Sequence, residues 1–123
     1  RYRKEEYTLL KVDLITGFLG SGKTTFIKKY AAVIESITKE MPSVRIYINS
    51  IFPVSASAAE KEPALAKIAD YNTALQEMCD GKHLGFIDNT GLVQENYYEE
   101  DGIHFKAEFY PVWATNMAEV ATL

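Results

Sequence analysis

Apolar, strand-like runs alternate with amphipathic helical patterns along this chain, and this alternation constrains its fold more than any other feature. Branched and other apolar residues, in continuous or alternating runs, predict short strands at residues 9–16, 44–49 and 84–88. Apolar residues at helical spacing predict helices at residues 26–41, 65–79 and 105–120. Pro111 falls near the first turn of the last helix, where proline is tolerated. The stretch 52–59, rich in serine, alanine and proline, predicts a loop, and residues 89–102 show no clear period.

The predicted order of elements is β-α-β-α-β-loop-α. Strands that alternate with helices in this way indicate an α/β fold with a parallel sheet between helices, and hence three layers, α/β/α. Ligands of such folds bind beyond the carboxyl ends of the strands. Three strands are few for this architecture, so we expect a short sheet that is incomplete or completed by a second copy of the chain.

Composition restricts the function further. The chain has 123 residues, enough for a single domain, 1–123. Its 13 basic and 17 acidic residues give a net charge of −4, which argues against nucleic acid as a partner because nucleic-acid-binding domains carry a basic face. A single cysteine, Cys79, forms neither an internal disulfide nor a multi-thiolate zinc site. No apolar run approaches the about 20 residues that cross a bilayer, and no export signal is visible, so we expect a cytoplasmic protein.

A glycine-rich segment lies between the first predicted strand and the first predicted helix. Its sequence, GFLGSGKT at 17–24, fits the phosphate-loop pattern G-x-x-x-x-G-K-[ST]. Glycines let backbone N–H groups converge on phosphate oxygens, Lys23 would reach the outer phosphates, and the Thr24 hydroxyl would help hold Mg²⁺. This pattern predicts a site for GTP or ATP with magnesium, and the alternative is a glycine-rich turn without a ligand. The predicted nucleotide-binding residues are Gly17, Gly20, Ser21, Gly22, Lys23, Thr24 and Thr25.

The longer string KVDLITGFLGSGKTTFIKKY resembles the start of the CobW-type P-loop GTPases, over about residues 10–31. The resemblance implies a β–P-loop–α unit that binds GTP with magnesium. Two motifs of that family, a cysteine-rich metal motif and the guanine-reading Asn-Lys-x-Asp, are absent from this sequence. The segment 88–91, DNTG, formally matches Asp-x-x-Gly; a magnesium or switch role for Asp88 and an ordinary strand-end turn are both open.

A carboxylate and an imidazole lie three residues apart in Asp101-Gly102-Ile103-His104. On a tight turn before a helix, both side chains can point into one cleft. The carboxylate would then accept from one ring nitrogen and fix the tautomer, and the other nitrogen could take a proton from a hydroxyl group. The alternative is a solvated turn with a surface histidine.

The chain from residue 30 to residue 123 resembles the C-terminal part of the SGNH hydrolases, the GDSL-type esterases and acylhydrolases. The matching stretches are YAAVIESITKEMPSVRIYINSIFPVS, IADYNTALQEMC and LGFIDNTGLVQENYYEEDGIHFKAEFYPVWATNMAEV. The resemblance implies a three-layer α/β/α fold and hydrolysis of a small-molecule ester without a cofactor. It also implies that Asp101 and His104 are the acid and base of a catalytic triad, and that Asp88 is a strand-end residue.

The sequence departs from that family at the nucleophile. The Gly-Asp-Ser block, the further oxyanion-hole glycine and the Gly-x-Asn-Asp block do not occur in it. Ser21 lies in a strand-to-helix loop but belongs to the phosphate-loop pattern, and Ser50, Ser55 and Ser57 fit structural or loop roles. Without oxyanion donors, a factor of about 10²–10³ in rate is lost. We therefore expect weak or no esterase activity.

The two resemblances meet in one helix, at about residues 28–31, which suggests a chimera of two α/β pieces. Three functions follow from this interpretation. The first is an esterase or acylhydrolase of the SGNH type, the second is a P-loop module that binds GTP or ATP with magnesium, and the third is an inactive fragment that forms homo-oligomers to cover an exposed sheet edge.

Overall fold

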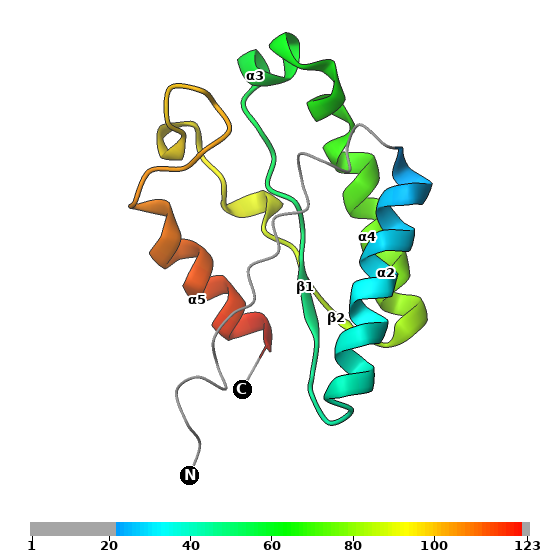
Figure 1. Cartoon of the computed structure of the whole chain (residues 1–123). Coiled ribbons are helices and arrows are strands. Elements are labelled where there is room, and N and C mark those ends of the chain that lie inside the picture. Colours follow the sequence, from blue (N-terminus) through cyan, green and yellow to red (C-terminus); the bar gives the residue numbers. More distant parts are fainter. Residues whose placement is uncertain (1–21, 122–123) are drawn as a thin grey trace.

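The computed structural model describes residues 22–121 and contains helices and short strands in alternation (Figure 1). The main elements are α2 (Lys23–Glu40), β1 (Tyr47–Asn49), α3 (Ala56–Lys61), α4 (Ile68–Lys82), β2 (Gly85–Ile87) and α5 (Phe109–Ala121). Three 3₁₀ turns complete them: η2 (Pro63–Lys67), η3 (Thr90–Leu92) and η4 (Glu95–Tyr97). The strand predicted at 9–16 lies outside the described residues.

The described sheet has two parallel strands, β1 and β2, with Tyr47 opposite Gly85 and Asn49 opposite Ile87. The chain crosses from β1 to β2 through α3 and α4, as parallel strands require. Helices α2 and α4 lie on one side of the sheet and α5 lies on the other (Figure 1). The predicted three-layer α/β/α fold is therefore confirmed.

Helix α2 shows how the sequence specifies these layers. Its apolar positions face the sheet and α4, so that Phe26 and Ile34 are buried while Lys28 and Glu35 stay exposed. Proline and serine at 42–43 follow its end, as predicted. The helix begins at Lys23, three residues before the predicted start.

Other predicted boundaries are also wrong, and the strand predicted from residue 44 begins at Tyr47. The predicted loop at 52–59 contains the start of α3, because the Ser55 hydroxyl accepts a hydrogen bond from the Ala58 N–H and alanine-rich sequence favours a helix. The helix predicted from residue 65 begins at Ile68, after the turn η2 that starts at Pro63. The helix predicted from residue 105 begins at Phe109, which places Pro111 in its first turn.

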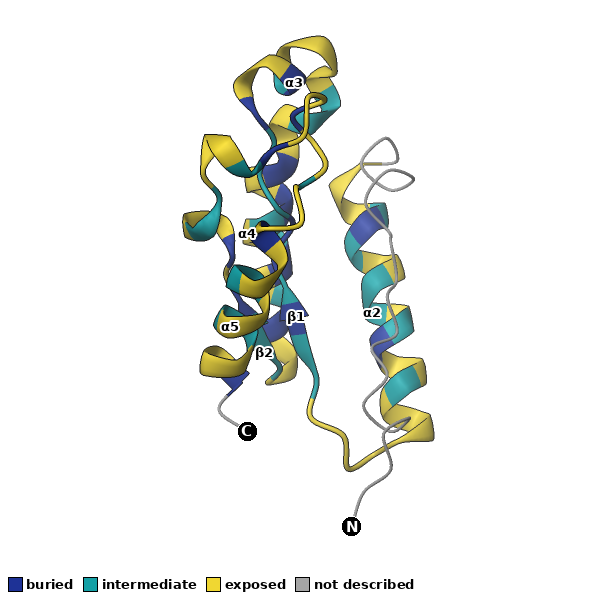
Figure 2. Ribbon diagram, turned by 90° about the vertical axis from the view of Figure 1, so that its left-hand side faces the viewer, coloured by how far each residue is buried: buried dark blue, intermediate teal, exposed yellow. Residues whose placement is uncertain are grey.

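The larger hydrophobic core lies between the sheet and the pair α2 and α4 (Figure 2). The Phe26 ring packs edge-on against Tyr71 of α4, with centroids 4.9 Å apart. Cys79 is fully buried there, and burial, assisted by the nearby Asp80 carboxylate, raises the pKa of its thiol to about 11. The core members are Phe26, Ile34, Ile48, Ile51, Ile68, Tyr71, Leu75 and Cys79.

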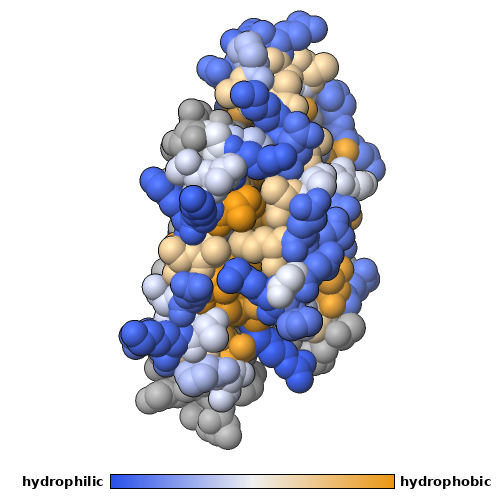
Figure 3. Space-filling model, turned by 90° about the vertical axis from the view of Figure 1, so that its right-hand side faces the viewer, coloured by the Kyte–Doolittle hydropathy of each residue, from blue (hydrophilic) through white to orange (hydrophobic). Residues whose placement is uncertain are grey.

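The outer face of α2 and α4 carries mostly hydrophilic residues, with hydrophobic atoms exposed in a strip between them (Figure 3). A hollow of about 630 Å³ opens on the side of α2, lined among others by Ile34, Val44 and Leu84. Within residues 22–121, no helix is long and apolar enough to cross a membrane.

Candidate active site

Asp101 and His104 lie on a tight loop between η4 and α5. An antiparallel bridge between Tyr98 and Phe105 closes this loop at its base. Inside it, the Glu99 N–H donates to the His104 carbonyl at 2.8 Å, and the Gly102 N–H donates to the Glu99 carbonyl at 3.0 Å. These bonds shape residues 98–105 into a compact turn, which we call the Asp–His loop.

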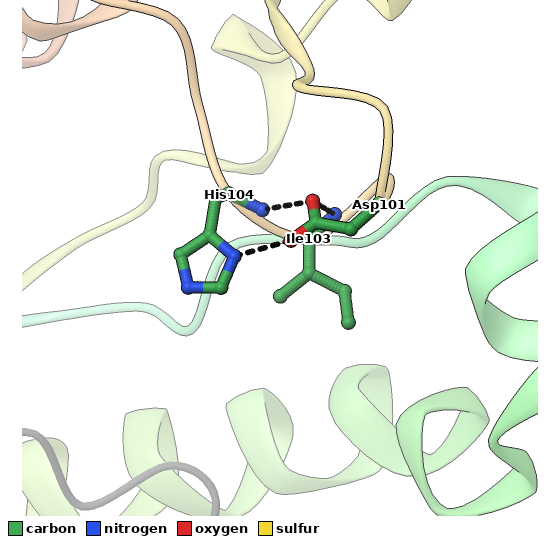
Figure 4. A network of polar contacts seen from close by, with 3 residues as sticks. All are labelled: Asp101, Ile103 and His104. Carbon is green, nitrogen blue, oxygen red and sulfur yellow. Dashed lines mark hydrogen bonds and ion pairs between the residues drawn. The ribbon is translucent and has the colours of Figure 1, made fainter.

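The two side chains are in direct contact (Figure 4). His104 Nδ1 lies 2.5 Å from Asp101 Oδ2, and Asp101 Oδ1 accepts from the backbone N–H groups of Ile103 and His104, each at 2.9 Å. The hydrogen bond to the His104 ring lowers the pKa of Asp101 most, and together with the two backbone hydrogen bonds it brings this pKa to about 2. The carboxylate is therefore ionised at neutral pH and can only accept, so Nδ1 carries the proton. This arrangement fixes the tautomer that leaves Nε2 as the basic nitrogen.

The pair lies at the surface. The His104 side chain is 77 % exposed and that of Asp101 is 44 % exposed. A catalytic base must reach its substrate, and this exposure permits access of a small molecule to the ring.

Aromatic side chains hold the Asp–His loop against α5. Phe105 stacks on Phe109 with centroids 4.3 Å apart, and the Phe52 ring packs edge-on against Phe105, Phe109 and Trp113. Phe109 is fully buried in this cluster. Because Phe52 follows the end of β1, the cluster connects the loop with the carboxyl end of that strand.

The serines of the strand ends have structural roles. Ser50 Oγ accepts from the Asn89 N–H at 2.9 Å, and Ser55 caps α3; both residues are buried. Beside them, the Asn89 amide donates to Asn49 and accepts from Asn116, so that both strand ends are joined to α5. These contacts hold the segment after each strand against α5.

Asp88 follows β2 and forms a local turn. Its Oδ1 accepts from the N–H of Thr90 at 2.9 Å and from the Thr90 hydroxyl at 2.7 Å. This is the geometry of an Asx turn at a strand end. Within residues 22–121, no group of three or more His, Cys, Asp or Glu residues could hold a metal ion.

The phosphate-loop residues are described only from Gly22 onward, since Gly17, Gly20 and Ser21 lie outside the described residues. Gly22 has φ +92° and precedes α2, and among the described residues no side chain caps this helix. Lys23 and Thr24 are exposed in its first turn, and Thr25 is half-buried. Figure 1 shows this helix start and the Asp–His loop toward the same end of the molecule, the end where α3 lies.

Two hollows of the described surface lie away from the pair. One hollow of about 400 Å³ lies along α5, lined among others by Leu92, Val112 and Asn116. The other, described above, lies beside α2. Neither of these two hollows is lined by Asp101 or His104.

Sequence reasoning missed the contacts that anchor the Asp–His loop. The Tyr98 hydroxyl donates to the Pro53 carbonyl at 2.7 Å, and the Ser55 N–H donates to the Gly102 carbonyl at 2.9 Å. The serine before an alanine-rich stretch was a usable signal for a helix cap. No local pattern could pair it with Gly102, which lies far away in the sequence.

No protein-family model matches this chain, and no curated protein sequence matches it either. Solved structures that are similar to it include the following two. The esterase domain of the ZfL2-1 ORF1 protein from the zebrafish ZfL2-1 retrotransposon matches with a TM-score of 0.68 at 19% identity, over 82% of this chain and 63% of that one. A GDSL-like lipase from Bacteroides thetaiotaomicron VPI-5482 matches with a TM-score of 0.64 at 18% identity, over 80% of this chain and 51% of that one. The chain thus spans less than two thirds of either structure, and its fold is similar to that of GDSL-type hydrolases.

Proposed function

We propose that this chain carries the acid–base part of an ester-hydrolysing site, with His104 as the general base and Asp101 as the carboxylate that orients it. The observation that carries the proposal is the 2.5 Å contact between His104 Nδ1 and Asp101 Oδ2 on an exposed ring. The similarity of the fold to an esterase domain and a GDSL-like lipase supports the same reaction class.

In this proposal each group of the pair has a distinct task. The Asp101 carboxylate accepts a hydrogen bond from the Nδ1–H group of His104 and stabilises the imidazolium that forms during the reaction. Nε2 removes a proton from the attacking hydroxyl group or water, and later returns it to the leaving alcohol. The reaction needs no metal or cofactor, and its substrates are small esters.

Water is the attacking group that the described residues favour. Ser50 and Ser55 are buried and engaged in hydrogen bonds, which makes them poor nucleophiles in the described conformation. Attack by water, with His104 as the base, requires no serine. We therefore expect a slow hydrolysis of activated esters, below that of a complete triad.

Replacing His104 tests this function. We expect His104→Ala to lower the protein-dependent hydrolysis of p-nitrophenyl acetate by about 10²-fold, or to the buffer rate, because general-base catalysis contributes about 10²–10⁴. Asp101→Asn should also slow the reaction, because the amide cannot hold the Nδ1–H tautomer. The rates are measured from released nitrophenolate at neutral pH.

The second histidine gives a matched control, since any exposed imidazole hydrolyses activated esters to some extent. His83 is exposed at the end of α4 and belongs to no carboxylate pair within residues 22–121. His83→Ala should keep the wild-type rate. Equal losses in the two variants, or none in either, would contradict a specific role of His104.

We infer a second candidate function, binding of GTP or ATP with magnesium, from the start of α2. The support is Gly22, which has a positive φ of +92° immediately before the N-terminus of α2, with the exposed Lys23 and Thr24 in the first turn. Backbone N–H groups at such a position attract phosphate. Thr24 is the residue that would hold the magnesium ion, because hydroxyl oxygens suit this hard cation.

Titration with a fluorescent GTP analogue in the presence of Mg²⁺ tests this second function. We expect Lys23→Ala to weaken binding by at least tenfold, because the ammonium group would pair with the outer phosphates. Lys28→Ala, on an exposed position of the same helix, serves as the matched control and should bind as the wild type does. Identical titrations for all three proteins would rule out a phosphate site here.

A further inference from the structure

The Asp–His loop packs against and is hydrogen-bonded to one short segment of the chain, Phe52–Ser55. This segment lies between β1 and α3. Three contacts join them: the Phe52 and Phe105 rings lie 5.1 Å apart, the Tyr98 hydroxyl donates to Pro53, and the Ser55 N–H donates to Gly102. Tyr98 and Phe105 also form the bridge at the base of the loop. The segment therefore holds the loop at both its base and its tip.

The contact between Gly102, at the tip of the loop, and Ser55 leaves no space for a side chain at position 102. Gly102 is buried with φ +70°, a conformation that L side chains rarely adopt. A Cβ atom added to it would lie 2.0 Å from Ser55 Oγ and 2.9 Å from Ser55 Cβ. Ser55 in turn is fixed, because its hydroxyl caps α3 through the Ala58 N–H. Only glycine fits between the loop and the start of this helix.

The left-handed turn at Gly102 lets the two following N–H groups reach back to Asp101. Ile103 and His104 both donate to Asp101 Oδ1, while the His104 ring contacts Oδ2. All three bonds depend on one backbone conformation. A change at Gly102 would separate the carboxylate from the backbone donors and from the ring together.

We propose that the segment Phe52–Ser55 is a positioning element of the active site, which holds Asp101 and His104 in register through the contacts of Ser55 with Gly102 and of Pro53 with Tyr98. This inference rests on the proposed function, since it assigns Ser55, Gly102 and Tyr98 the task of orienting the acid–base pair. They touch no reacting atom and act through the loop that carries the pair.

Titration of Asp101 by NMR of its side-chain carboxyl carbon tests the inference, because it reports the three hydrogen bonds directly. We expect the pKa of Asp101 to rise from about 2 in the wild type toward its ordinary 3.8 in Gly102→Ala. Ser55→Gly in the Gly102→Ala background should recover part of the shift, because it removes the clashing atoms while glycine remains an acceptable helix cap. Gly91→Ala is the matched control, since nothing lies within 4 Å of a Cβ there.

Tyr98→Phe provides a second route if Gly102→Ala does not fold. It keeps the ring that stacks on Phe105 and removes only the hydroxyl bond to Pro53. We expect a smaller rise of the Asp101 pKa in this variant and none in Tyr97→Phe. An Asp101 pKa that stays at about 2 in folded Gly102→Ala or, failing that, in Tyr98→Phe overturns the proposal. If Ser55→Gly does not lower the Asp101 pKa again in the Gly102→Ala background, Ser55 has no part in the positioning.

The titration needs no substrate, so its result is independent of ester hydrolysis. If the wild-type protein hydrolyses no ester but the variants show the expected pKa shifts of Asp101, the proposed function is wrong and the positioning role stands. The converse result, hydrolysis that depends on His104 with an unmoved Asp101 pKa, would retain the function and overturn the positioning role.

Discussion

Phe109→Ala is expected to lower the free energy of unfolding by about 3–5 kcal/mol, the cost of removing a buried aromatic ring. Phe109 is fully buried and packs against Phe52, Tyr97 and Phe105. The ring thus joins α5, the Asp–His loop and the segment after β1. A cavity at this point cannot be filled easily, because Phe52, Tyr97 and Phe105 are large planar rings.

Urea denaturation followed by tryptophan fluorescence measures this effect. Trp113 is the only tryptophan of the chain, and its ring lies 5.2 Å from Phe52 in the same cluster. Tyr110→Ala is the matched control on the same helix, because Tyr110 is 45% exposed and its loss should cost well under half as much. A loss below about 1 kcal/mol for Phe109→Ala would contradict the described packing of α5.

Phe26→Ala is expected to have a comparably large effect, about 3–5 kcal/mol, at the other face of the sheet. Phe26 is fully buried and packs edge-on against Tyr30 and Tyr71, with centroids 5.5 and 4.9 Å apart. It is the first core residue of α2, the helix in which the two sequence resemblances meet. The loss of unfolding free energy in Phe26→Ala therefore measures how strongly the packing of α2 stabilises the domain.

Circular dichroism and Trp113 fluorescence, recorded in the same denaturation, distinguish two outcomes. A single cooperative domain gives coincident transitions that shift together in Phe26→Ala. If α2 were a weakly attached piece, the helical signal would change before the fluorescence of Trp113 in α5. Lys28→Ala, an exposed residue two positions further along α2, is the control and should leave both transitions within about 0.5 kcal/mol of the wild type.

Local sequence signals predicted the layers of this fold. The helical spacing from Phe26 onward, the apolar run around Ile87 and the proline near the start of α5 are properties of neighbouring residues. Burial of one apolar face is enough to specify such elements. The boundary errors arose where short-range cues competed, as at Ser55, where a serine- and alanine-rich stretch resembles a loop but forms a capped helix.

The candidate pair itself was also predicted from the sequence, because Asp101 and His104 lie within one turn and their spacing decides whether they can meet. Tertiary structure alone decided what surrounds them. The bonds from Tyr98 to Pro53 and from Ser55 to Gly102, and the amide contacts of Asn89 with Asn49 and Asn116, join residues far apart in the chain. Such contacts depend on how whole elements pack, and no local periodicity encodes them. The sequence by itself thus determined which residues can form an acid–base pair, and the packing of the loop on the segment after β1 decided where that pair is held.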